Sequence, residues 1–130
     1  MPVSLSVVVP VKDEAGNVGP LAREIADAVA AEDAEIIFVD DGSGDATADE
    51  LIALKAALPN LRILRHGRNS GQSRAIRTGV RAAQGAIVAT LDGDGQNDPA
   101  DLPKLVTALR ADNRLGMVSG VRAKRKDTFS

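Results

Sequence analysis

Apolar and polar positions along the chain follow two patterns that alternate. Short apolar runs rich in Val and Ile are typical of strands buried on both faces. They predict strands at residues 5–10, 35–39, 61–64, 86–91 and 115–121. Between these runs, apolar residues recur every three or four positions, which is the period of a helix with one buried face. They predict a helix that follows Asn17 as its cap, and helices over 46–58, 73–84 and 102–111.

This alternation predicts an α/β fold with a mostly parallel sheet and right-handed crossovers. The third helix is expected to point Ile76, Val80 and Ala83 inward, with Gly85 ending it. Residues 122–130 form a basic, polar tail. The last predicted strand is then an exposed sheet edge, and such edges invite pairing with another chain. A homodimer through that edge is therefore a hypothesis.

The composition restricts the number of domains, the kind of core and the kinds of site that the chain can form. The 130 residues suit one domain, and with two Phe and no Trp or Tyr its core must be aliphatic. The chain has no Cys, which excludes disulfides and thiolate metal sites. A net charge of −2 gives no argument for a nucleic-acid partner. We find no signal peptide and no apolar run near the ~20 residues of a membrane span.

Acidic residues follow three of the predicted strands, at the edge where ligands bind in parallel sheets. The most informative segment is Asp92-Gly93-Asp94-Gly95-Gln96. Two carboxylates one residue apart can share one hard cation, Mg²⁺ or Mn²⁺, that leaves positions open for substrate phosphates. A plain turn is the simpler alternative, because Asp and Gly favour turns. A calcium loop of the EF-hand type is excluded, since its sixth and twelfth positions would be Asn97 and Pro103.

The other strand ends also carry candidate ligand groups. Asp41 is placed to accept the ring N–H of a nucleotide base, although Asp41, Ser43 or Asp45 could equally cap the next helix. Asp13 and Glu14 have a similar alternative, as acids at a helix start.

The segment before the third helix offers contacts to phosphate. The backbone N–H groups near Gly71 and the side chain of Arg74 are the candidates. Arg77 and Arg81 continue along one side of that helix, where a solvated face is the usual interpretation and contact with anionic lipid the sharper alternative. His66, the single histidine, receives no role.

Competing α/β families lack their signatures here. A dinucleotide-binding domain needs Gly-x-Gly-x-x-Gly after its first strand, and residues 10–16 do not contain it. The chain also has no P-loop pattern. A receiver-like signalling domain that binds Mg²⁺ carries an acceptor Asp after its third strand, where this chain has Arg65-His66-Gly67.

Four segments in order resemble glycosyltransferase family 2, whose fold is called GT-A. They are residues 6–14, 37–43, 69–79 and 91–96. The Asp-Gly-Asp-Gly-Gln segment, followed by Asp98-Pro99, is most similar to polyprenyl-phosphate sugar transferases such as dolichyl-phosphate mannose synthase. The resemblance implies a metal-dependent, inverting transfer of a sugar from a UDP- or GDP-sugar to a polyprenyl phosphate. It also implies a cytoplasmic enzyme, peripheral at the inner face of the cell membrane.

The resemblance assigns roles residue by residue. Donor-binding residues would be Pro10, Val11, Glu14, Asp41, Gly71, Arg74 and Asp92. Asp92 and Asp94 would be catalytic, holding the metal together with Gln96. Lys12 stands where the family often has Tyr, which leaves the choice between UDP and GDP open.

The family's catalytic domain continues well beyond its fifth strand. Residues 1–121 would therefore be the nucleotide-sugar-binding half of a GT-A domain, and no residue is a candidate for a catalytic base. A non-catalytic nucleotide-sugar-binding module is the alternative.

Overall fold

The computed structural model describes residues 3–91, 98–111, 117–118 and 121–125. Helices and strands alternate along this part of the chain, as the apolar pattern predicted. The elements in order are β1 (Leu5–Val11), α1 (Val18–Ala28), β2 (Ala34–Asp40), α2 (Thr47–Leu54), β3 (Leu61–Arg65), α3 (Gln72–Ala82), β4 (Ile87–Thr90), η1 (Pro99–Asp101), α4 (Leu102–Ala111), β5 (Met117–Val118) and β6 (Val121–Arg125).

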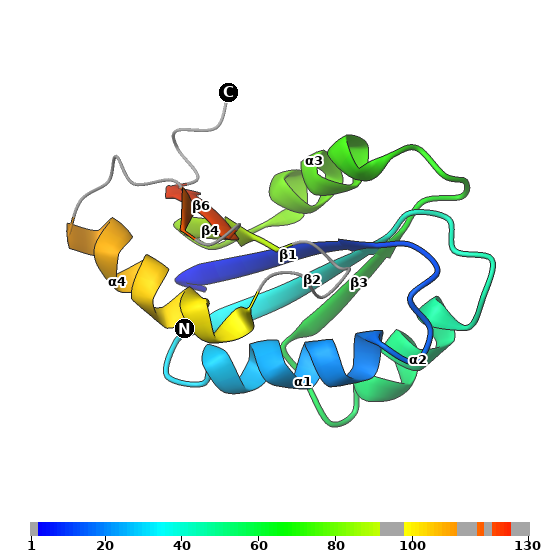
Figure 1. The fold of residues 1–130 in the computed structure, drawn as a ribbon, viewed down its shortest axis with the longest axis horizontal. Coiled ribbons are helices and arrows are strands. Elements are labelled where there is room, and N and C mark those ends of the chain that lie inside the picture. Colours follow the sequence, from blue (N-terminus) through cyan, green and yellow to red (C-terminus); the bar gives the residue numbers. More distant parts are fainter. Residues whose placement is uncertain (1–2, 92–97, 112–116, 119–120, 126–130) are drawn as a thin grey trace.

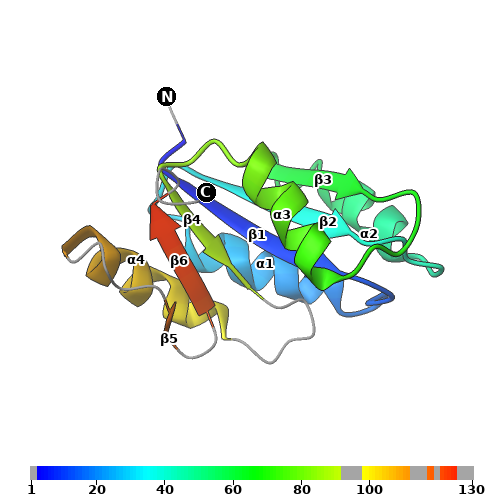
Figure 2. The same cartoon turned by 90° about the horizontal axis from the view of Figure 1, so that it is seen from above.

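One sheet runs through the molecule with the strand order β3-β2-β1-β4-β6-β5 (Figure 2). The four strands β1 to β4 are parallel, while β6 pairs antiparallel with β4 and β5 antiparallel with β6. The predicted α/β class with a mostly parallel sheet is confirmed. The order reverses beside β1, which is where an open parallel sheet forms a ligand crevice.

The C-terminal end of the described chain differs from the sequence prediction. Within the strand expected at 115–121, the described residues Met117–Val118 form β5 and Val121 begins β6, which extends through Arg125 into the segment assigned to the tail. Pairing of Ile87 with Arg125 places this polar strand inside the sheet. Among the described residues, β5 rather than β6 therefore forms this edge, and the homodimer stays a prediction.

Alternate residues of the strands face two different layers of helices. Leu5, Val7 and Val9 of β1 point into a core covered by α1, α2 and α4, whereas Val8 points to α3. This is the period of two expected for strands. In Figure 1, α3 lies on one side of the sheet and α1 and α2 on the other.

The helix α3 packs closely because its inward residues are small. Ala75 and Gly79 are buried, while Ile76 and Val80, which were predicted to point inward, are half-buried. A Cβ at Gly79 would lie 2.3 Å from Cγ1 of Val8 in β1. Of the residues predicted to point inward, Ala83 is buried and Val80 packs against the same core cluster, while Ala75 and Gly79 add the small residues through which the helix approaches the sheet most closely.

Gly85 is required for a reason other than the predicted helix cap. The helix α3 ends at Ala82, three residues earlier. A Cβ at Gly85 would lie 2.7 Å from the backbone N of Ser6 and 2.8 Å from the backbone C of Leu5. The chain after α3 therefore passes so close to β1 that no side chain fits there.

Candidate functional site

The ends of β1, β2 and β4 meet at one edge of the sheet, as predicted. The backbone N–H of Asp41, just past β2, donates to the carbonyl of Val11 at a distance of 2.9 Å. The N–H of Leu91, just past β4, donates to the carbonyl of Val8, also at 2.9 Å. Asp92, Asp94 and Gln96, the predicted metal ligands, lie outside the described residues. In the described part of the chain, no group of three acidic or histidine side chains is arranged to hold a metal.

The neighbouring acids Asp40 and Asp41 face opposite sides of the sheet, because strand side chains alternate. Oδ1 of Asp40 accepts the N–H of Ser43 at 3.0 Å, which fixes the turn after β2. Its buried Oδ2 lies 3.4 Å from Nε of Arg65, a charge contact without a hydrogen bond. Asp40 therefore supports the turn from one face, while Asp41 is directed to the face that carries α3.

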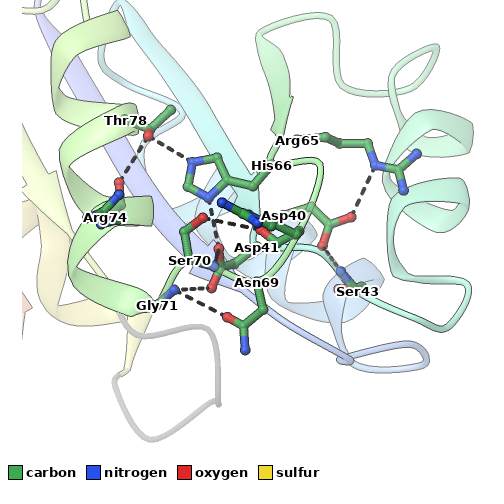
Figure 3. Close-up of polar contacts among 11 residues, drawn as sticks. Asp40, Asp41, Ser43, Arg65, His66, Asn69, Ser70, Gly71, Arg74 and Thr78 are labelled. Atoms are coloured by element: carbon green, nitrogen blue, oxygen red, sulfur yellow. Dashed lines mark hydrogen bonds and ion pairs between the residues drawn. The ribbon is translucent and has the colours of Figure 1, made fainter.

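The carboxylate of Asp41 fastens the loop that leads into α3. Oδ1 accepts the N–H of Ser70 at 2.8 Å and contacts Nδ1 of His66 at 2.8 Å. Oδ2 accepts the N–H of Gly71 at 2.8 Å (Figure 3). Burial alone raises the pKa of Asp41, but the hydrogen bonds from Ser70, His66 and Gly71 outweigh it and hold the pKa below its ordinary value. Asp41 is therefore an anion at neutral pH.

His66, which the sequence analysis left without a role, links Asp41 to α3. Its Nε2 lies 2.8 Å from the hydroxyl of Thr78, and that hydroxyl donates to the carbonyl of Arg74 at 2.9 Å. His66 therefore connects the carboxylate of Asp41, through the hydroxyl of Thr78, to the backbone of α3.

Strand order is the signal that could have identified His66. The residue directly follows β3, and β3 pairs with β2 so that Arg65 lies opposite Asp40. His66 and Asp41 are the next residues along the two neighbouring strands. A lone histidine shows no motif in the sequence. Once β3 is placed beside β2, however, His66 is expected to lie one strand spacing away from Asp41.

The loop after β1 is fixed to the start of α2 by four consecutive backbone N–H groups. Those of residues 13–16 donate to the side chains of Ser43, Thr47, Asp45 and Glu50, over 2.8–3.2 Å. Asp13 adopts the left-handed conformation, with φ of 53°, and its carboxylate accepts the N–H of Gly44. The backbone of this loop is therefore held rigidly against the turn after β2.

These contacts decide between the capping alternatives. Asp45 accepts the N–H of Thr47, the first residue of α2, at 3.0 Å, whereas Ser43 binds the neighbouring loop. Asn17 precedes α1 as predicted, but its side chain makes no cap hydrogen bond and donates to Glu14 at 3.1 Å instead.

Gly42 joins the third loop to the other two. It has a φ of 76°, and a Cβ there would lie 2.5 Å from the backbone N of Asn69. The loop of residues 66–71 therefore lies directly on the turn after β2. Together, the loops 12–17, 41–47 and 66–71 form one connected unit, which we call the edge-loop unit.

The remaining predicted donor residues are found in and around this unit. Pro10 and Val11 are buried in β1, and Val11 packs into the core. The N–H of Gly71, assigned to a phosphate, donates to Asp41 and to Asn69 in the structure. Glu14 is half-buried and the side chain of Arg74 is exposed. Their contacts with a ligand stay predictions.

Comparison with known proteins agrees with this architecture. A sequence model described as Glycosyl transferase family 2 matches residues 6–130. A dodecaprenyl-phosphate galacturonate synthase from Rhizobium johnstonii is 41% identical over 96% of this chain and 38% of its own length. An undecaprenyl-phosphate 4-deoxy-4-formamido-L-arabinose transferase from an Enterobacter species is 37% identical over 96% of this chain and 38% of its own length. The chain thus spans little more than a third of these relatives.

A solved structure shares the fold. The mannosyltransferase from Pyrobaculum calidifontis, in complex with GDP-Man and Mn²⁺, aligns with a TM-score of 0.75 and 22% identity, over 98% of this chain and 46% of that one. No helix in the described part of the chain has the length and apolar character needed to cross a membrane.

Proposed function

We propose that this chain, which belongs to glycosyl transferase family 2, is the donor-binding part of an enzyme that transfers a sugar from a nucleoside diphosphate sugar to a polyprenyl phosphate. The observation that carries the proposal is the edge-loop unit, built around Asp41 where β1, β2 and β4 end together. A reversal of strand order such as the one beside β1 is where open α/β sheets bind nucleotides, outside the carboxyl ends of the strands. The names of both relatives include a polyprenyl phosphate.

The nucleoside would be bound between Glu14 and Asp41, over the end of β1. Oδ2 of Asp41 accepts a single hydrogen bond within the described structure, from Gly71, and so retains acceptor capacity for a base N–H. The carboxylate is held in one orientation by three contacts, which reduces the entropy lost on binding. Uracil and guanine both offer a ring N–H, so the base stays open.

The metal site is proposed on the chemistry of its donor set. Asp92, Asp94 and Gln96 supply only oxygen ligands, which suit Mg²⁺ or Mn²⁺. When bound, the cation would neutralise charge on the leaving diphosphate. A phosphate acceptor is ionised near neutral pH and needs no general base, in agreement with inversion without a base residue in this chain. Such an acceptor also implies peripheral attachment at the cytoplasmic face of a membrane.

Calorimetric titration with UDP and GDP, with and without Mn²⁺, tests the donor site. We expect metal-dependent binding of one nucleotide, and a loss of at least tenfold, about 1.4 kcal/mol, in D92A/D94A. The control is D27A/D49A, which removes the same charge from exposed positions of α1 and α2. Equal binding by D92A/D94A and the control would contradict the metal site, and no binding of either nucleotide would contradict the donor site.

A nucleotide-sugar-binding module without transfer of its own is the second candidate. The observation in its favour is that the described edge-loop unit offers a binding crevice but no candidate base. Incubation with radiolabelled UDP- and GDP-sugars and a polyprenyl phosphate separates the two, because only an enzyme moves label into the lipid fraction.

A further inference from the structure

A second polar site lies beside α3, on the side of the helix that faces β3. A pocket of about 300 Å³ is lined by His66, Ser70, Arg74, Arg77, Thr78 and Arg81. We call it the α3 basic pocket. Pockets for organic ligands are lined mainly by apolar side chains. All six residues here are polar or charged, so the pocket is suited to a charged group and not to an acyl chain.

The charges around the pocket are all positive. Arg74, Arg77 and Arg81 are exposed and form no ion pair within the described part of the chain. No carboxylate lines the pocket. Asp41, which contacts the pocket residue His66, already accepts the backbone N–H groups of Ser70 and Gly71. Arg62 of the adjacent β3 is paired with Glu35 and does not compete for an anion.

Helical spacing brings the three guanidinium groups to one side. Arg74, Arg77 and Arg81 follow each other by three and four residues, the spacing at which helix side chains are neighbours. A solvated stripe would leave them pointing into open water. Here they line a pocket together with His66, Ser70 and Thr78. Forked guanidinium donors match phosphate oxygens better than any other side chain.

We propose that the α3 basic pocket binds a phosphate-bearing anion, either the headgroup of an anionic lipid or a soluble phosphate. The pocket shares His66 and Ser70 with the edge-loop unit, and Arg74 is also a predicted donor-binding residue. Arg77 and Arg81 extend it along α3, and Arg81 lies ten residues beyond Gly71, or about 15 Å along the helix axis. The proposal is therefore tested at Arg77 and Arg81, which the proposed donor site does not use.

Two probes distinguish the sources of phosphate. Inorganic phosphate is titrated at constant ionic strength while backbone amide resonances of α3 are followed by NMR. Flotation with vesicles of phosphatidylcholine, with and without phosphatidylglycerol, measures binding to lipid headgroups. Shifts on α3 with inorganic phosphate identify a soluble ligand. Binding only to vesicles that contain phosphatidylglycerol identifies a headgroup.

The decisive comparison is between R77Q/R81Q and R23Q/K104Q. Both double variants remove two positive charges from exposed helix positions, but Arg23 and Lys104 lie on α1 and α4, across the sheet. We expect R77Q/R81Q to weaken binding at least fivefold and the control less than about twofold, since only the former removes forked phosphate contacts. Binding of neither probe by the wild-type chain, or equal losses in the two variants, overturns the proposal. Unchanged melting temperatures establish that both variants fold. The nucleotide titration above separates failure of this site from failure of the donor site.

Discussion

The two ends of β2 carry carboxylates that fasten the two ends of α3. Glu35, at the start of the strand, accepts the N–H of Gln84 just after α3 at 2.6 Å. Asp41, just past the end of the strand, accepts the N–H of Gly71 just before α3 at 2.8 Å. Both side chains lie on the same face of the sheet, because they are six residues apart in an alternating chain. The position of α3 is therefore set by two acids of one strand.

Each acid is paired with a base from the neighbouring strand β3, and each base also reaches α3. Arg62 donates to Glu35 at 2.6 Å and to the carbonyl of Ala82 at 3.0 Å. His66 contacts Asp41 and Thr78, both at 2.8 Å. We call these two networks the Glu35 clamp and the Asp41 clamp. In each, an acid at one end of β2 contacts a base at or just past β3, and that base also contacts a residue of α3.

The difference between the clamps is the chemistry of the base. Arg62 presents a forked guanidinium group, and its Nη1 bonds both Glu35 and the carbonyl of Ala82. His66 presents two separate ring nitrogens, one toward Asp41 and one toward Thr78. The arginine clamp fastens the C-terminal end of α3, whereas the histidine clamp lies in the edge-loop unit, beside the proposed ligand site.

Removing the Glu35 clamp should cause the largest loss in the free energy of unfolding. Burial alone raises the pKa of Glu35, but hydrogen bonds from Ser6, Gln84 and Arg62 lower it below its ordinary value. Glu35→Ala leaves those three donors without their acceptor, at a cost of about 3 kcal/mol in the free energy of unfolding. Urea unfolding measures it, with Glu24→Ala on the exposed side of α1 as control. A loss within about 0.5 kcal/mol of the control would mean that the clamp does not hold α3.

A smaller loss in the free energy of unfolding is expected from a substitution at Gly42, where two loops of the edge-loop unit are in close contact. Gly42 and Gly16 have similar positive φ angles, 76° and 86°. A Cβ at Gly42 would lie 2.5 Å from Asn69 N, whereas a Cβ at Gly16 would meet nothing within 4 Å. Gly16→Ala should therefore cost about 1 kcal/mol for the backbone angle alone, and Gly42→Ala about 1 kcal/mol more for the displaced loop.

Urea unfolding of the two glycine variants isolates the loop contact, because the backbone penalty is common to both. Nucleotide titration of Gly42→Ala then reports whether the loop position matters for binding. Equal unfolding energies for the two variants would show that residues 66–71 move freely away from the turn after β2.

The four parallel strands of the sheet could be predicted because their residues are mostly apolar. The first four predicted strands correspond to β1–β4 within one or two residues at each end, and the alternation of elements indicated their parallel direction. The extension of β6 beyond Val121 was hidden, since three of its last four residues are charged and pair with β4 by backbone hydrogen bonds that need no apolar pattern. The part that Gly79 plays in the buried face of α3 was missed because Gly79 contributes to packing by its lack of a side chain.

The edge-loop unit was predictable as a location but not as a network. Acidic residues after three strands marked the edge, and the role predicted for Asp41 as a ligand to a nucleotide base stays a prediction. Its partners could not be derived, because Ser70, Gly71 and His66 are 25–30 residues away and reach it only through the strand order. The long-range contacts that involve backbone N–H groups leave no trace in residue type.

A further prediction concerns how the contribution of Asp41 to stability depends on pH. Its pKa in the folded chain is lowered from 3.8, so its contribution to stability is fully present above about pH 5 and is lost as the pH falls through the folded value. Asp41→Asn keeps the shape but cannot accept from Ser70, Gly71 and His66 at once. We expect a loss of about 1.5 kcal/mol at pH 7.

The gap between wild type and Asp41→Asn, measured by urea unfolding at pH 7, 5, 4 and 3, should be constant to about pH 5 and then shrink. Glu35 and Asp45 also have lowered pKa values and destabilise both proteins in acid, so the difference between the two is the informative quantity. Asp27→Asn, an exposed change of the same charge on α1, should show a small gap with no trend. A gap that stays constant down to pH 3 would mean that the ionised carboxylate is not what holds the loop. The position of the loop would then rest on its packing against Gly42.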